Sequence, residues 1–131
     1  MHPWSDRRAL ELLNIALPIV QAPMAGAQGV ELAVAVSLAG GLGSLPCAML
    51  SPAQVAEQVA AFRAASGGPL NLNFFCHQPP AADDTREQAW RERLAPFYRE
   101  LGIDPAAPIP VSNRAPFDAA FCEVVQALRP E

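Results

Sequence analysis

The residues best suited to contact a ligand follow the first apolar run of the chain. Residues 18–26 read PIVQAPMAG, a short β-branched run that opens into a loop of small residues. Proline and alanine let a bound molecule approach the backbone, and the polarisable thioether of Met24 suits contact with a π-face. Ala22, Pro23 and Met24 carry no titratable group, so they suit ligand contact rather than acid–base chemistry. The alternative is a tight strand-to-helix turn that is simply packed, which short motifs of this kind often are.

A second polar group lies in a later apolar run. Residues 70–75 read LNLNFF. An asparagine amide offers both a donor and an acceptor, and it destabilises a buried strand unless it is paired. Asn71 and Asn73 have the same strand parity, so either side chain could point toward a ligand. The alternative for Asn73 is local capping of the strand end.

The other reactive side chains are better explained without catalysis. His77 follows Cys76, and no carboxylate lies close in the sequence to orient its ring, so a loop histidine is the simpler interpretation. The three cysteines, which also include Cys47 and Cys122, are odd in number and widely spaced. They predict neither a disulfide framework nor a paired zinc motif. Reduced thiols of a cytoplasmic protein are the expectation.

Composition excludes several classes of protein. The chain has 131 residues, of which 51% are apolar, and this argues against disorder. Its net charge is −4 and it contains no lysine, so a nucleic-acid surface is not expected. No run of 18 apolar residues occurs, so no membrane span is predicted. Arg7 and Arg8 precede an apolar stretch, but Glu11, Asn14 and Pro18 argue against a signal peptide.

Strand-like and helix-like segments alternate along the chain. Residues 1–17 form a lead-in with at most a turn of helix. Glycines 40 and 41 end the first main helix, whereas Ser51 and Pro52 begin the second. Pro96 predicts a kink or a break within the third. The expected strands are 18–23, 42–46 and 70–75; the expected helices are 30–39, 52–66, 86–101 and 117–128; the expected loops are 24–29, 76–85 and 102–115.

This order predicts an α/β fold with parallel strands and right-handed crossovers. Short strands separated by helices are typical of a (β/α)8 TIM barrel, but such a barrel needs roughly 250 residues. The chain supplies about half of that number, so the expectation is a partial barrel of three β/α units plus an extra helix. Open strand edges and an uncovered apolar face then predict self-association or pairing with a complementary half-barrel.

Three motifs in this order resemble the N-terminal half of nitronate monooxygenases, formerly called 2-nitropropane dioxygenases. They are PIVQAPMAG at 18–26, AGGLGSL at 39–45 and NLNFF at 71–75. The resemblance extends over nearly the whole chain from about residue 12, and each motif lies by the end of a predicted strand. The AGGLG piece alone is also similar to related flavin and nucleotide barrels.

The resemblance implies a (β/α)8 barrel that binds FMN and oxidises alkyl nitronates with O2 to a carbonyl compound and nitrite. It places Ala22, Pro23 and Met24 beside the flavin ring and assigns Asn73 a hydrogen bond to the cofactor. The catalytic histidine of the family, on its fourth strand, and its phosphate-binding glycine loops have no counterpart here. No catalytic residue or metal ligand is therefore assigned, and the chain alone is expected to be inactive.

Two alternatives remain at this point. One is a fragment of a flavin-dependent enoyl reductase-like barrel, which shares the AGGLG motif. The other is a non-catalytic half-barrel that functions only through assembly.

Overall fold

The computed structural model describes residues 4–78, 81, 83–108 and 114–130. The chain divides into two compact units. The first, unit 1, comprises Met1–His77 together with Arg114–Glu131, and the second, unit 2, comprises Gln78–Asn113.

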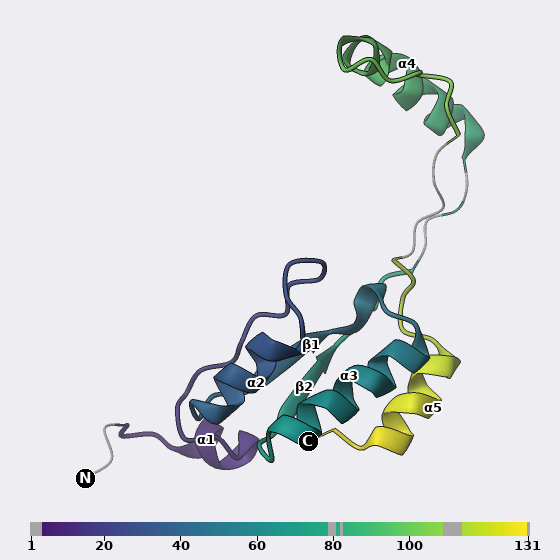
Figure 1. The fold of residues 1–131 in the computed structure, drawn as a ribbon. Helices are drawn as coiled ribbons and strands as arrows, with labels where there is room; N and C mark the ends of the chain where they lie inside the picture. The colour runs from purple at the N-terminus through teal and green to yellow at the C-terminus, as the bar shows by residue number, and fades with distance from the viewer. Residues whose placement is uncertain (1–3, 79–80, 82, 109–113, 131) are drawn as a thin grey trace. The chain divides into compact units, whose positions relative to one another are not determined.

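Unit 1 contains two parallel strands and the helices that connect and cover them (Figure 1). The strands pair in register from Gly43 opposite Leu70 to Pro46 opposite Asn73. A helix lies between them in the sequence, as a parallel crossover requires. The α/β class and the parallel strands are thereby confirmed. The elements of unit 1 are α1 (Arg8–Leu13), α2 (Val30–Leu38), β1 (Gly43–Pro46), the 3-10 helix η1 (Cys47–Met49), α3 (Pro52–Ala65), β2 (Leu70–Asn73) and α5 (Ala119–Leu128).

Helix α3 begins where its capping residues predict. The Ser51 hydroxyl accepts a hydrogen bond from the Gln54 backbone N–H at 3.3 Å, and the Gln54 side chain accepts one from the Ser51 N–H at 2.8 Å. This reciprocal pair is a capping box. Pro52 occupies the first helical position, where its missing N–H costs nothing.

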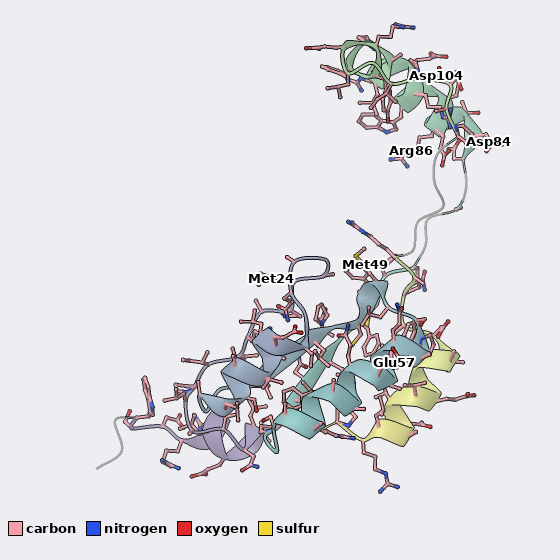
Figure 2. The ribbon with its side chains drawn as sticks, viewed as in Figure 1. Met24, Met49, Glu57, Asp84, Arg86 and Asp104 are labelled. Atoms are coloured by element: carbon pink, nitrogen blue, oxygen red, sulfur yellow. The ribbon has the colours of Figure 1, made fainter. Side chains whose placement is uncertain are left out.

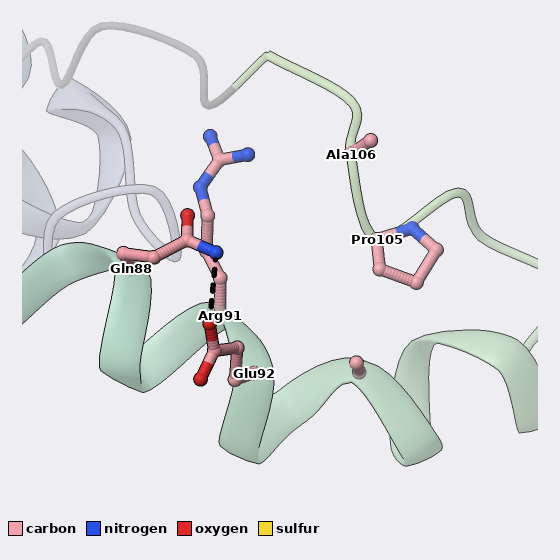
Figure 3. Close-up of a pocket in the computed structure, with 6 residues that line it drawn as sticks. Gln88, Arg91, Glu92, Pro105 and Ala106 are labelled. Atoms are coloured by element: carbon pink, nitrogen blue, oxygen red, sulfur yellow. Dashed lines mark hydrogen bonds between the residues drawn. The ribbon is translucent and has the colours of Figure 1, made fainter.

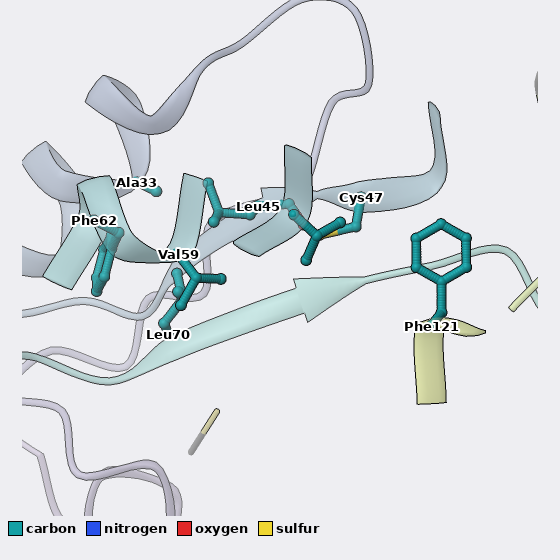
Figure 4. Close-up of a cluster of buried hydrophobic side chains, with 8 residues drawn as sticks. Ala33, Leu45, Cys47, Val59, Phe62, Leu70 and Phe121 are labelled. Atoms are coloured by element: carbon teal, nitrogen blue, oxygen red, sulfur yellow. The ribbon is translucent and has the colours of Figure 1, made fainter. Parts of the chain in front are cut away.

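The core of unit 1 is built by both strands and three helices (Figure 4). Leu45 of β1 and Leu70 of β2 are almost completely buried. Gly43 lies so close to α2 that an added Cβ would meet the backbone carbonyl of Ala33. Helix α2 therefore packs directly on β1 through backbone contact. The buried cluster consists of Ala33, Leu45, Cys47, Val55, Val59, Phe62, Leu70 and Phe121.

The predicted strand at 18–23 is reduced to a single bridge. Val20 pairs with Leu42 in parallel. The Leu42 N–H donates to the Ile19 carbonyl at 2.9 Å, and the Gln21 N–H donates to the Leu42 carbonyl at 3.0 Å. Pairing stops there, so the prediction of a full strand was wrong.

Proline explains why the pairing stops. In a continued parallel ladder, the Ser44 carbonyl would accept a hydrogen bond from the backbone N–H of residue 23. Pro23 has no N–H to donate. The chain therefore leaves the sheet after Gln21, and side chains serve Ser44 instead.

Unit 2 contains one helix among its described residues, α4 (Asp84–Glu100). Asp83 caps the helix by accepting the Arg86 N–H at 2.9 Å. The helix continues through Pro96, so the predicted break does not occur. Proline leaves only the Glu92 carbonyl without its helical donor, and Glu92 is exposed to water. Gly102, at φ +70°, follows the helix end.

Several boundaries differ from expectation. Strand β2 ends at Asn73 rather than at residue 75, and helix α4 begins at Asp84 rather than at residue 86. Helix α5 begins at Ala119 rather than at residue 117, because Asp118 is its N-cap and accepts the Phe121 N–H at 3.0 Å. The lead-in contains a helix of six residues, α1. The predicted loops 76–85 and 102–115 lie partly outside the described residues.

Candidate functional site

The predicted ligand-contacting residues lie at one end of the parallel strands. Ala22, Pro23 and Met24 follow the bridge at Val20, and Asn73 is the last residue of β2. Carboxyl ends of parallel strands meet at the same edge of a sheet. Ala22, Met24 and Asn73 are exposed there and Pro23 is half-buried. Figure 2 shows Met24 on the loop between the bridge and α2.

A buried amide replaces the missing backbone ladder beside this loop. The Ser44 N–H donates to Oε1 of Gln21 at 3.1 Å, and Nε2 of Gln21 donates to the Ser44 carbonyl at 3.2 Å. Gln21 and Ser44 are both buried. The side chain of Gln21 thus makes the hydrogen bonds to the Ser44 backbone that a longer first strand would have made.

A second amide holds the loop itself. Nε2 of Gln28 donates to the Ser44 carbonyl at 2.9 Å, and Oε1 of Gln28 accepts the Met24 N–H at 3.2 Å. Gln28 thereby ties the backbone of Met24 to β1. Gly26 has φ +78°, a backbone conformation that glycine adopts without strain. The loop is therefore positioned by hydrogen bonds and does not depend on packing of Met24.

The two asparagines of β2 play different parts. Nδ2 of Asn71 donates to the Ser44 hydroxyl at 3.1 Å, and Asn71 is partly buried. Asn73 lies two residues further along β2, opposite Pro46, and is exposed. Asn71 is thus engaged within the protein, whereas the amide of Asn73 is accessible to a ligand.

Sequence reasoning did not assign Gln21 and Gln28. The available signal was Pro23, because a proline at the end of a parallel strand requires another donor for the carbonyl opposite. Two glutamines close to that proline could have been identified as the substitutes.

A pocket of about 460 Å³ lies beside the loop. The residues predicted to contact a ligand are not among those that line it. The lining residues are Gly26, Ala27, Gln28, Gly29, Pro46, Met49, Leu50 and Gln58. A smaller pocket of about 280 Å³ lies within unit 2 (Figure 3).

The cysteines of the structure are free thiols. Burial raises the pKa of Cys47 to about 11, an effect that the backbone N–H of Asn73 partly opposes. Cys47 is therefore a protonated thiol at neutral pH and a weak nucleophile. Cys76 and His77 are exposed, and the ring of His77 lies edge-on to Phe75, with the centroids 5.7 Å apart. No cluster that could hold a metal ion occurs among the described residues.

Comparison with known proteins places this geometry in a family. The family model for nitronate monooxygenase matches residues 7–126. The chain belongs to the nitronate monooxygenase family. It is 44% identical over 101 residues to a nitronate monooxygenase of Paraburkholderia phytofirmans, a match that covers 77% of this chain and 28% of the relative. It is 41% identical over 106 residues to that of Pseudomonas aeruginosa, covering 81% of this chain and 30% of the relative.

Solved structures agree with this family membership. The structure of nitroalkane oxidase from Streptomyces ansochromogenes matches with a TM-score of 0.66 and 29% identity, and covers 92% of this chain and 32% of that one. FabK from Thermotoga maritima matches with a TM-score of 0.52 and 30% identity, over 72% of this chain and 33% of that one. The weaker second match does not favour the enoyl reductase alternative.

The chain spans less than a third of the length of the two relatives described above. Among the described residues, no helix is long and apolar enough to cross a membrane.

Proposed function

We propose that this chain forms one wall of the FMN site of a nitronate monooxygenase, as the first three β/α units of a (β/α)8 barrel. The observation that carries the proposal is the exposure of Met24 and Asn73 at the same end of the strands, on segments positioned by hydrogen bonds. Ligand sites of barrel enzymes lie at that end.

The residues present suit a flavin. Met24 is 46% exposed although it is a large apolar side chain, and a thioether packs well against an aromatic ring. Ala22 and Pro23 keep the approach to the backbone open. The exposed amide of Asn73 supplies a donor and an acceptor for the polar edge of the ring. FMN, when bound, would supply the electron-transfer chemistry needed to oxidise a nitronate.

The side chains at this wall bind and orient, and they do not move protons. None of Ala22, Pro23, Met24 and Asn73 titrates. By the family resemblance, the base and the phosphate site belong to parts of the barrel without counterparts in this chain. We therefore expect this polypeptide to give no conversion of an alkyl nitronate and O2 into a carbonyl compound and nitrite.

Free thiols support a reducing, cytoplasmic location.

Flavin titration tests the wall. When the 131-residue chain is added to FMN, the visible spectrum and the fluorescence of the flavin should change and reach saturation. Met24→Gln and Asn73→Ala should each weaken this binding about fivefold to tenfold, the loss of one favourable contact. Leu38→Gln is the matched control, because Leu38 is 68% exposed and lies at the C-terminal end of α2.

Either of two results would contradict the proposal. Absence of saturable binding by the wild-type chain would remove FMN from this surface. Equal weakening by Leu38→Gln would show that the response does not come from the predicted wall. Nitrite release above that of free FMN would separately refute the expectation that the chain is inactive.

A further inference from the structure

Within unit 2, helix α4 and its C-cap carry a stripe of large apolar side chains that are exposed among the described residues. The four side chains of the stripe are spaced four, three and four residues apart, so the three within the helix lie on one face, and the fourth continues that face at the C-cap. Two described residues after the helix, Pro105 and Ala106, line a pocket with Gln88 and Glu92 (Figure 3). By helical spacing, Gln88 and Glu92 lie on the opposite side of α4 from the stripe. The members of the stripe are Trp90 (53% exposed), Leu94 (38%), Phe97 (61%) and Leu101 (72%).

The spacing of the stripe is symmetric about its centre. Reversing the order of four, three and four leaves it unchanged. Two copies of α4 laid antiparallel would therefore place Leu94 of each copy against Phe97 of the other. Trp90 of each copy would meet Leu101 of the other. Each large ring is thus matched with a leucine, and four layers of contact form from one repeated surface. An interface that uses the same patch on both copies is what two-fold symmetry requires.

Charges beside the stripe favour the antiparallel arrangement. Arg93 and Glu100 are seven residues apart, so they flank the same side of the stripe. In the antiparallel register, Arg93 of each copy lies opposite Glu100 of the other, which gives two attractive pairs. Arg93 already leans toward the stripe, with its guanidinium carbon 5.7 Å from the centre of the Trp90 ring.

A parallel pair of helices would lack this match. It would set Arg86 of one copy opposite Arg91 of the other, and like charges at such flanking positions repel. Pro96 lies outside the stripe and does not obstruct either arrangement.

We propose that the stripe of α4 is a self-association surface that pairs two copies of this chain as antiparallel helices. This assembly is independent of flavin binding and is distinct from completion of the barrel by unit 1. Four side chains per copy make a small interface, so the dimer is expected to be weak and to dissociate on dilution.

Sedimentation equilibrium over a range of concentrations tests the proposal on the 131-residue chain. The wild type should shift from monomer toward dimer as its concentration rises. Leu94→Glu should raise the dissociation constant at least tenfold, since by symmetry it places a charge in two layers. Leu12→Glu is the matched control, because Leu12 is 85% exposed on α1, and it should leave the dissociation constant unchanged.

A charge exchange makes the test specific for orientation. Arg93→Glu alone sets two acidic pairs against each other and should weaken dimerisation about tenfold. Arg93→Glu combined with Glu100→Arg restores opposite charges and should restore the dimer. Far-UV circular dichroism of each variant confirms that α4 is still helical. The side chains changed in these variants are all exposed, so folding should be preserved. They are Leu12, Arg93, Leu94 and Glu100.

Three outcomes would overturn the proposal. The first is a chain that stays monomeric at every concentration, which would leave the stripe to another segment or protein. The second is a dimer that Leu94→Glu leaves intact but Val20→Glu dissociates, which would place association at the open sheet of unit 1. The third is failure of the exchanged pair to rescue Arg93→Glu, which would exclude the antiparallel register.

Discussion

The side-chain amide of Gln21 is hydrogen-bonded to both backbone groups of Ser44, at 3.1 Å to its N–H and 3.2 Å to its carbonyl. This pair lies just beyond the bridge between Val20 and Leu42. It keeps the first segment attached to β1 after the backbone ladder has ended at Pro23. The loop that bears Met24 starts from this attachment, so the shape of the candidate flavin wall depends on a buried glutamine.

Replacing Gln21 with alanine should destabilise the chain by about 2 kcal/mol, because it leaves the buried Ser44 N–H without its acceptor. Urea unfolding followed by circular dichroism measures the difference. Gln126→Ala, at an exposed site on α5, should stay within about 0.5 kcal/mol of the wild type. Equal unfolding midpoints for the two variants would show that the Gln21 pair adds no stability.

Gly43→Ala should be costly, because the added Cβ would run into the backbone of Ala33. We expect a loss of about 2 to 3 kcal/mol in the free energy of unfolding. Gly67→Ala is the control, since no heavy atom lies within 4 Å of its added Cβ. It should be neutral or stabilising by about 0.5 kcal/mol. A tolerated alanine at 43 would mean that α2 can move away from β1 at little cost.

The two asparagines of β2 should separate stability from ligand binding. Asn71→Ala removes the donor to the Ser44 hydroxyl and should cost about 1 kcal/mol of stability while leaving FMN affinity unchanged. Asn73→Ala should weaken FMN binding while leaving the stability of the chain unchanged. Unfolding midpoints and flavin titrations on the same two proteins decide the matter. If Asn71→Ala is the variant that weakens flavin binding, the roles assigned to them are exchanged.

Stability should fall at alkaline pH because of Cys47. Burial raises the pKa of its thiol from an ordinary value of 9.0 to about 11. The folded chain holds this proton more tightly than the unfolded chain, so deprotonation favours unfolding. The contribution is fully present below pH 9.0 and is lost as pH rises toward about 11. Denaturant titrations at several pH values should show this decline, and Cys47→Ala should flatten it.

The same burial should make the cysteines react at different rates. Cys76 is exposed and Cys47 is buried. A thiol-alkylating reagent at neutral pH should therefore modify Cys76 long before Cys47. Mass spectrometry of digested samples taken over time identifies which residue has reacted. Modification of Cys47 at the rate of Cys76 would indicate that the core opens readily.

Local patterns located most of the helices and both regular strands. Ser51 and Pro52 identify the start of α3, because a hydroxyl cap and a proline at the first turn act within a few residues. The stripe on α4 is also visible in the sequence at helical spacing. Its exposure is not, because helical periodicity alone does not tell whether another surface covers an apolar face.

The sequence by itself determined the alternating α/β order, the resemblance to nitronate monooxygenases and the small-residue character of the loop at 22–26. These properties follow from neighbouring residues. Only the tertiary structure decided that the first strand ends at one bridge, that Asn71 rather than Asn73 is engaged with Ser44, and that Gln21 and Gln28 hold the loop. Those outcomes depend on backbone groups that remain unpaired where segments distant in sequence meet. Each such buried donor or acceptor must find a partner in space.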